Sequence, residues 1–529
     1  MSRRRFLGSA AGGAAWCAAS RARAAAPDSR PGIIVIAADD LGFADLGCYG
    51  SEIHTPNLDR LAAGGARFST GYSFPRCCPS RAALLTGRTP HEAGLGFMVS
   101  HDSPPLPNPV AYQGFLRTGV PTLAERLRYV GYRTCLSGKW HVGEHRPNWP
   151  CDRGFESSFG LLGGAASYFD PSGSRAQPRQ RRLFRDGRLI TIGGGEGFYF
   201  TDEIGGSAAA QIDACASDPR PLFLYAAFTA PHWPLHARPD DIRLYRDRYR
   251  SGWDEVRAER HRHQLELGLA DPAWGLAPRD PAVPAWRDVP NPGEMAHKMA
   301  VYAAQVHRLD HQVGRLLDAL EQSGRAGNTV VIFISDNGGD PSRPPVVDPA
   351  LQRYDGNTFG GALSYDGVGP GWAQVSNTPF RRHKRFAHEG GIAVPFLARG
   401  PGFTPGKWRR EPVTLLDIVP TCLGAAGVSL GRGESLPGRD LRVYGPGAAD
   451  FVCGWEHMGN RAYRQGDHKL VAADGGPWEL FHVGRDRAEA RDLAATEPGR
   501  LAAMIRAYDA WAQRVGVLPW PVTLQGGFG

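Results

Sequence analysis

The chain has 529 residues, 42% of them hydrophobic and 22% charged, which is the composition of a globular protein long enough for more than one domain. Its 61 basic and 53 acidic residues give a formal net charge of +8. Residues 1–26 hold five arginines and no acidic residue, so the rest of the chain has 56 basic residues against 53 acidic ones. This near-neutral body excludes a nucleic-acid-binding protein that relies on overall positive charge.

Residues 1–26 have the parts of an export signal. The motif "SRRRFL" (Ser2–Leu7) fits the twin-arginine pattern, small residues follow over Gly8–Ser20, and "ARA" and "AAA" are candidate cleavage sites. We predict export of the folded protein by the Tat translocase and a periplasmic or secreted location; a disordered basic tail is the alternative. No later segment reaches the roughly 18 apolar residues of a membrane-spanning helix, so we predict no stable membrane span.

Apolar, β-branched runs predict strands that are buried on both faces. In chain order these runs are 32–40 ("GIIVIAADD"), 221–234 ("PLFLYAAFTAPHWP"), 329–339 ("TVVIFISDNGG") and 393–400 ("AVPFLARG"). Between them, apolar residues at helical spacing predict helices over 122–134, with Gly131 as C-cap, and over 296–322. Strands that alternate with helices predict an α/β fold with a large central, mostly parallel sheet flanked by helices.

The last part of the chain has a different pattern. The segments 460–473 ("NRAYRQGDHKLVAA") and 477–483 ("PWELFHV") predict short antiparallel strands, and 497–515 predicts a helix. We therefore divide the chain into a catalytic domain over 27–447 and a smaller C-terminal domain, an antiparallel sheet plus a helix, over 448–529.

Two of the predicted buried strands end in oxygen-bearing side chains. The first ends in Asp39 and Asp40, and the third ends in Asp336 and Asn337. Ligands gather at the carboxyl ends of parallel strands, and four oxygen ligands without His or Cys suit a hard cation, Ca²⁺ or Mg²⁺. Each pair taken alone is also typical of a turn or a helix cap.

The segment "RCCPSRAALLTGR" (Arg76–Arg88) places Cys77 and Cys78 at the start of a predicted helix. A disulfide, a metal clip or a nucleophile would each explain adjacent thiols. The eight cysteines that follow the export signal have no paired spacing, which argues against a disulfide framework. A thiol at a helix N-terminus has a lowered pKa and can act as a nucleophile, but soft sulfur does not choose Ca²⁺ or Mg²⁺.

The run "CCPSRAALLTGR" (Cys77–Arg88) resembles the C-x-P-S-R-x-x-x-L-T-G-R signature of the sulfatases, the formylglycine-dependent branch of the alkaline-phosphatase-like superfamily. The resemblance implies that a formylglycine-generating maturation enzyme oxidises Cys77 to formylglycine. One hydroxyl of the hydrated aldehyde then ligates the metal and attacks sulfur, and the other expels sulfate. Cys78 occupies the variable position of the motif.

Further motifs follow in the order of the same family, and the similarity to bacterial arylsulfatase-like members runs from about residue 33 to the C-terminus. They are "SGKWHVGEH", with Lys139 and His141, "TAPHWPLHA", with His232, and "NTPFRRHKRFAHEGGI", with Lys384. Each of these residues, taken alone, is also typical of an ordinary structural or surface position.

The resemblance also implies a role for each residue. Arg81 braces the formylglycine and the aspartates, and Lys139 and Lys384 neutralise the sulfuryl oxygens together with the metal. His232 and Lys384 flank the leaving oxygen. His141 is implied to remove the proton from the second hydroxyl. Asp336 is implied to bind the metal and to activate the attacking hydroxyl.

These observations predict a sulfuric ester hydrolase that acts on an aryl or carbohydrate sulfate. The alternatives are a phosphonate monoester or phosphodiester hydrolase of the same superfamily, and a non-catalytic carbohydrate-binding relative. Substrate choice is expected to reside in the loops 100–120, 163–197 and 340–371.

Overall fold

The structure is a computed structural model that describes residues 28–102, 107–172, 181–344, 359–406, 408–443 and 450–525. The predicted export signal lies outside the described residues. Within them, no helix combines the length and the apolar character needed to cross a membrane.

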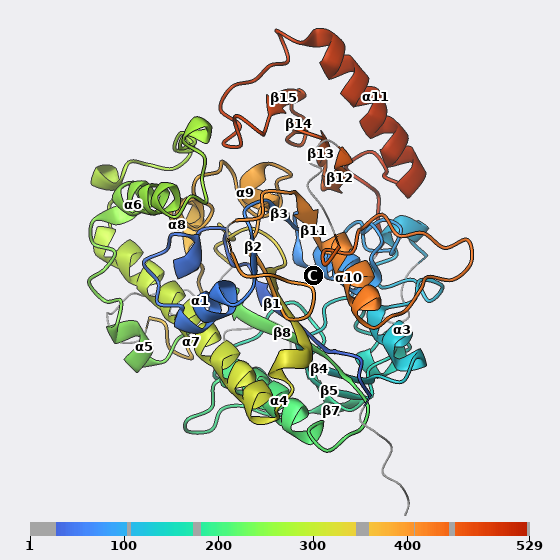
Figure 1. The fold of residues 1–529 in the computed structure, drawn as a ribbon. Helices are drawn as coiled ribbons and strands as arrows, with labels where there is room; N and C mark the ends of the chain where they lie inside the picture. Colours follow the sequence, from blue (N-terminus) through green and yellow to red (C-terminus); the bar gives the residue numbers. More distant parts are fainter. Residues whose placement is uncertain are drawn as a thin grey trace, which may run out of the picture.

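A mixed sheet of nine strands, counted over the described residues, forms the centre of the fold (Figure 1). Its strand order is β2-β10-β9-β1-β8-β4-β5-β6-β7. The five strands from β9 to β5 run parallel to one another, and the pairings outside this group are antiparallel. The strands are β1 (Gly32–Asp39), β2 (Ala66–Phe68), β4 (Arg133–Lys139), β5 (Ser157–Leu161), β6 (Leu183–Arg185), β7 (Arg188–Ile190), β8 (Leu222–Pro231), β9 (Thr329–Ser335) and β10 (Phe396–Arg399).

The predicted α/β fold is therefore confirmed. The runs predicted at 32–40, 221–234 and 329–339 are the parallel strands β1, β8 and β9, whereas the run at 393–400 contains the antiparallel strand β10. A separate short pair joins β3 (Gly71–Tyr72) to β11 (Val413–Thr414).

Helices cover both faces of the sheet because β1 is apolar on both sides. Ile34 and Ile36 pack into one hydrophobic cluster with α4 and α7, and Ile33 and Val35 pack into another with α2, α3 and α10. Figure 1 shows these two groups of helices on opposite sides of the strands. The helices of this domain are α1 (Pro56–Ala63), α2 (Cys77–Thr86), α3 (Leu123–Tyr129), α4 (Phe200–Ala214), α5 (Pro239–Arg243), α6 (Gly252–Glu266), α7 (Pro292–Gln322), α8 (Gly369–Ser376), α9 (Glu389–Ile392) and α10 (Ile418–Ala425).

The predicted cap of α3 is off by one position. The C-cap residue is Val130, and the predicted Gly131 follows it with a φ of 90°. Glycine suits this position because a left-handed conformation strains other residues. The glycine therefore turns the chain just after the helix instead of capping it.

The C-terminal region is an antiparallel sheet in the order β12-β13-β14-β15, covered by α11 (Pro498–Val515), at one end of the molecule in Figure 1. Its strands are β12 (Val452–His457), β13 (Asn460–Gln465), β14 (His468–Ala472) and β15 (Glu479–His482). The composition of 452–457 did not predict β12. The indole N–H of Trp455 on β12 donates to the Ser73 carbonyl at 2.9 Å and so fixes this sheet to the segment before α2.

Candidate active site

The carboxyl ends of β1 and β9, which are parallel neighbours, bring four predicted ligands together. Asp39 is the last residue of β1 and Asp40 follows it, while Asp336 and Asn337 follow β9. Asp40 has a φ of 67°, a left-handed conformation that Asp tolerates better than most residues. Its backbone N–H donates to Asp336 Oδ1 at 3.2 Å, and Asn337 Nδ2 donates to Asp40 Oδ1 at 2.6 Å. Four side chains from two distant segments thus form one buried cluster.

Two buried cations face these carboxylates. Lys139, at the end of β4, places Nζ 2.6 Å from Asp39 Oδ2. Arg81, on α2, donates to Asp336 Oδ2 through Nε at 2.9 Å and lies 3.7 Å from Asp39 Oδ1. All four side chains are fully buried, so each charge depends on its partner.

Cys77 is the first residue of α2 and every residue of this helix is buried. Arg76, the N-cap residue, has an extended backbone. The hydroxyl of Ser80 accepts a hydrogen bond from the Phe74 N–H and donates one to the Phe74 carbonyl, each at 3.0 Å. These contacts fix the turn that presents Cys77 at the positive end of the helix dipole. Gly87, with a φ of 67°, ends the helix.

The surroundings of Cys77 favour negative charge. Burial raises the pKa of its thiol, but the positive charges of Lys139 and Lys384, and hydrogen bonds with His141 and His232, outweigh burial and hold the pKa well below its usual value. The side chain is 2% exposed. A group at this position is therefore suited to be an anionic or strongly polarised nucleophile.

His141 forms a hydrogen bond with Cys77 and has a φ of 54°. Its ring packs against Gly164, where a Cβ atom would come within 2.6 Å of Cε1, and its Nε2 lies 3.2 Å from Cys78 Sγ. Burial and the charge of Lys139 lower the pKa of His141 to about 4. The ring is therefore neutral near pH 7 and can accept a proton.

Lys384 connects the aspartates to a fourth acidic residue, Asp340. Its Nζ lies 2.7 Å from Asp40 Oδ1 and 3.1 Å from Asp340 Oδ2. His232 Nε2 lies 3.4 Å from Asp40 Oδ2. Burial lowers the pKa of Lys384, but Asp340 and Asp40 outweigh it and hold this pKa well above its usual value, so the ammonium group remains charged.

Tyr168 fixes the segment that carries His232. Its hydroxyl donates to the carbonyls of Thr229 and His232, each at 2.8 Å. Tyr168 is therefore a positioning residue for His232.

The oxygen atoms of the cluster fit a hard cation. Asp39, Asp40, Cys77 and His232 each place one ligand atom within 4.8 Å of the others. Asp39 Oδ1 and Asn337 Oδ1 are buried without a hydrogen-bond partner among the described residues, which is costly unless a cation binds them. The carboxylate and amide oxygens suit Ca²⁺ or Mg²⁺, whereas the sulfur of Cys77 does not.

The structure brings all the predicted site residues into this one cluster. They are Asp39, Asp40, Cys77, Arg81, Lys139, His141, His232, Asp336, Asn337 and Lys384. The roles that the resemblance implies for them stay predictions. Asp340 was not predicted, although "SDNGGD" places it in the loop that leaves β9.

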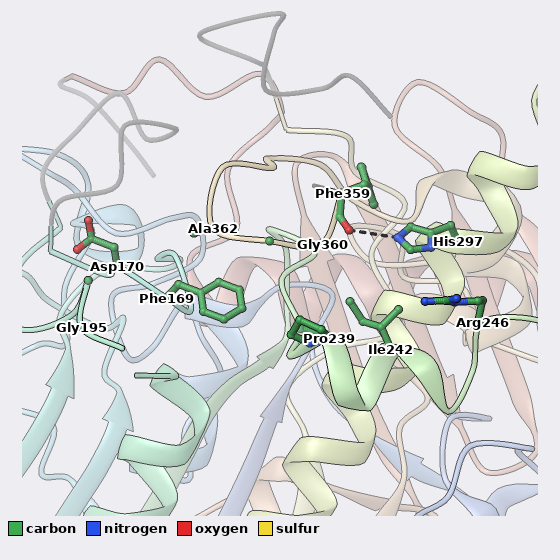
Figure 2. Close-up of a pocket in the computed structure, with 13 residues that line it drawn as sticks. Phe169, Asp170, Gly195, Pro239, Ile242, Arg246, His297, Phe359, Gly360 and Ala362 are labelled. Atoms are coloured by element: carbon green, nitrogen blue, oxygen red, sulfur yellow. Dashed lines mark hydrogen bonds between the residues drawn. The ribbon is translucent and has the colours of Figure 1, made fainter. Parts of the chain in front are cut away.

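A separate cavity of about 670 Å³ lies between two of the loops expected to select substrates (Figure 2). Phe169 and Gly195 line it from the loop 163–197, and Phe359 and Gly360 line it from the loop 340–371. At one side of the cavity, a nitrogen of His297 forms a hydrogen bond with the Phe359 carbonyl at 3.1 Å. Residues of the loop 100–120 are not among the described residues that line it.

Comparisons with known proteins agree with this geometry. A model of the sulfatase family matches residues 31–428. The chain is 35% identical to an uncharacterized sulfatase of Schizosaccharomyces pombe, over 94% of this chain and 96% of that protein. It is 34% identical to an arylsulfatase of Klebsiella aerogenes, over 78% of this chain and 91% of the arylsulfatase. The crystal structure of Ps i-CgsB in complex with k-i-k-neocarrahexaose has a TM-score of 0.68 and 26% identity, over 91% of this chain and 93% of that one.

Proposed function

The chain belongs to the sulfatase family, and on that premise we propose that it uses a formylglycine made from Cys77 and a divalent cation, Ca²⁺ or Mg²⁺, to hydrolyse its sulfate ester. The enzyme class, hydrolysis of aryl or carbohydrate sulfate esters, follows from the family. The nucleophile and the cation are the parts that we add.

One observation carries this proposal: the buried cluster has more acidic than basic side chains. The carboxylates of Asp39, Asp40, Asp336 and Asp340 outnumber the cations of Arg81, Lys139 and Lys384. Burial, and then the neighbouring Asp39, raise the pKa of Asp336 well above its usual value. A cation bound by Asp39, Asp40, Asp336 and Asn337 would offset this excess, and it would supply positive charge to the sulfuryl oxygens.

The protein's own side chains supply the other parts of the chemistry. Lys139 and Lys384 remain positioned to stabilise the negative charge of the sulfuryl group, and removal of either should lower the rate roughly 10²- to 10³-fold. Either His232 or Lys384, which both contact Asp40, would protonate the leaving oxygen. His141, neutral near pH 7, is placed to remove a proton at position 77.

Conversion of Cys77 to formylglycine would replace a sulfur, which hard cations bind weakly, by oxygen. It requires a formylglycine-generating enzyme as partner. Export by the Tat translocase to the periplasm or the medium remains a proposal that rests on residues 1–26 alone. The arylsulfatase of Klebsiella aerogenes and the oligosaccharide bound to Ps i-CgsB support an aryl or saccharide sulfate as substrate.

Two measurements on protein co-expressed with a formylglycine-generating enzyme test the proposal. Trypsin releases the peptide "CCPSR", because it cleaves after Arg76 and Arg81, and fragment masses distinguish a change at Cys77 from one at Cys78. We expect the aldehyde at position 77. Sulfate release from p-nitrophenyl sulfate is compared with hydrolysis of a phenyl phosphonate monoester. An unmodified Cys77 in active protein, or a higher kcat/KM for the phosphonate, would contradict the proposal.

A further inference from the structure

Two arginines lie beside the catalytic cluster without a carboxylate partner. Arg76 directly precedes Cys77, Arg385 directly follows Lys384, and the backbone N–H of Arg385 donates to the Pro75 carbonyl at 2.8 Å. Arg76 is half-buried, and its Nε is buried without a hydrogen-bond partner. Arg385 is exposed and has a φ of 81°. Neither guanidinium has a partner of opposite charge among the residues that the structure describes.

The two guanidinium groups lie within reach of each other's charge and of the catalytic groups. Burial, and then the positive charge of Arg76, lower the pKa of Arg385, which Asp340, Asp40 and Cys77 partly restore. The two like charges repel each other, and an anion bound by both arginines would offset this repulsion. The carboxylates of Asp40 and Asp340 already bind Lys384, so they do not serve as the anion that the two arginines would bind.

A buried histidine from the C-terminal domain completes these surroundings. His457, the last residue of β12, is fully buried and stacks on Phe97 with 5.7 Å between ring centroids. Burial and the charge of Arg76 lower its pKa to about 3, so the ring is neutral and adds no further positive charge. Both ring nitrogens are buried, and a hydrogen bond with the Gly96 backbone offsets only part of this lowering of the pKa.

The sulfate ester alone does not account for the two arginines. In the proposed function, three basic side chains and a divalent cation carry five positive charges, against four carboxylates and one charge on a sulfate ester. That arrangement is already neutral. The charges of Arg76 and Arg385 therefore remain for a second anionic group.

We propose that Arg76 and Arg385 form a second anion-binding subsite, and that the natural substrate carries a further carboxylate or sulfate group close to the ester that is cleaved. The inference rests on the proposed function and names the substrate class of the same site. Guanidinium groups bind carboxylate and sulfate oxygens through paired, charge-assisted hydrogen bonds, which a lysine cannot match in geometry. Binding of this group relieves the repulsion between the two arginines.

A set of phenyl sulfates that differ in one substituent tests the subsite. 3-Carboxyphenyl sulfate and 1,3-phenylene disulfate carry the second anion, and 3-carbamoylphenyl sulfate is a neutral analogue of nearly the same shape. We expect the wild-type kcat/KM to be at least about tenfold higher for the two dianions than for the neutral analogue. The two dianions separate a carboxylate-selective from a sulfate-selective subsite.

Arg76→Gln and Arg385→Gln should each reduce this preference about tenfold, mainly through KM, because the group they bind does not react. Arg76→Lys should retain part of it. Arg506→Gln is the matched control, since Arg506 is an exposed arginine of α11, and it should leave the preference unchanged. Equal losses on all three substrates, or no wild-type preference, would overturn the inference.

A binding measurement separates this inference from the proposed function. If none of the sulfates is hydrolysed, the proposed function fails, and calorimetric titration of Cys77→Ala protein still tests the subsite. We expect tighter binding of 3-carboxyphenyl sulfate than of the carbamoyl analogue, and loss of that difference in Cys77→Ala/Arg76→Gln. Equal affinities for the two ligands would also overturn the inference.

Discussion

Two clusters of buried charge in this protein differ in how completely their members are paired. The first is the candidate active site at the ends of β1 and β9, with four carboxylates, three basic side chains and two buried oxygen atoms that lack a partner. The second lies between the catalytic domain and the C-terminal sheet. It pairs Glu389 of α9 and Glu489 with Lys469 of β14 and Arg487.

The second cluster is balanced, with two acids and two bases. Lys469 Nζ lies 2.8 Å from Glu389 and 2.9 Å from Glu489, and Arg487 Nε lies 2.8 Å from Glu389. The hydroxyl of Tyr72 donates to the same Glu389 carboxylate at 3.0 Å. Buried charge is therefore not by itself the mark of a catalytic centre in this fold. Buried atoms without a hydrogen-bond partner occur in both clusters, Asp39 Oδ1 in the first and Glu489 Oε1 in the second, so the excess of acidic side chains is what separates the first cluster from the second.

The largest expected effect is the loss of activity in Cys77→Ala. Without a nucleophile at this position, kcat/KM for p-nitrophenyl sulfate should fall at least about 10⁴-fold. Cys78→Ala is the matched control: the two thiols are adjacent and equally buried, but Cys78 contacts Met98 and His141 instead of the aspartates. A Cys77→Ala protein that releases sulfate at a rate like that of Cys78→Ala would remove Cys77 from the mechanism.

Lys469→Met, in the second cluster, should lower the stability of the protein without changing its activity. Removal of one partner leaves Glu389 and Glu489 with less compensation, so the free energy of unfolding in urea should fall by about 3–5 kcal/mol. The kcat/KM of the folded fraction should not change. In Lys469→Met/Glu389→Gln the loss should be smaller than in Lys469→Met, because an uncompensated charge is gone. A drop in kcat/KM with unaltered stability would place Lys469 in the catalytic machinery. It would contradict the assignment of the second cluster to a structural role.

Metal removal should affect the first cluster alone. After dialysis against a chelator, addition of Ca²⁺ to a hundredfold excess over its Kd should stabilise the wild-type protein by about 3 kcal/mol. Lys469→Met should gain as much, whereas Asp39→Asn should gain less, since the orphaned Asp39 Oδ1 is a proposed ligand. The thermal midpoint and the metal content of the protein are the readouts. An equal gain in Asp39→Asn would exclude Asp39 as a ligand.

The sequence predicts those parts of the fold and the site that depend on local pattern. The strands β1, β8 and β9 are buried on both faces and are therefore long apolar runs. The strand β7 is largely exposed and β12 has a mixed composition, so neither gives such a signal. The oxygen ligands at two strand ends and the motif at Cys77 are likewise local.

Pairings between distant segments could not be predicted in the same way. Glu389 meets Lys469 and Arg487 from 80 and 98 residues away, and although Glu389 lies in a family motif, no local pattern indicates which bases it pairs with. Asp340 gains its importance only from Lys384, which arrives from 44 residues further along the chain. Whether the acidic and basic side chains of a buried cluster balance each other is a property of tertiary packing. We call the balanced second cluster the closed cluster.

The smallest expected effect is the acid sensitivity of the closed cluster. Burial raises the pKa of Glu389, but Lys469 and Arg487 outweigh it and lower this pKa from 4.5 to about 2. A carboxyl group with a depressed pKa stabilises the folded state above pH 4.5, and this contribution is lost as the pH falls toward 2. Between pH 5 and pH 3 the free energy of unfolding should therefore fall by about 2 kcal/mol on account of this one group.

Urea unfolding at pH 5, 4 and 3 measures this dependence, and Glu389→Gln isolates it. The variant lacks the titrating carboxyl group, so its stability should decline less steeply with acid than that of the wild-type protein, although its absolute stability is lower. Parallel pH profiles of the two proteins would mean that Glu389 is protonated in the fold at pH 5. The second cluster would then not be a balanced set of ion pairs, and its contrast with the candidate active site would be lost.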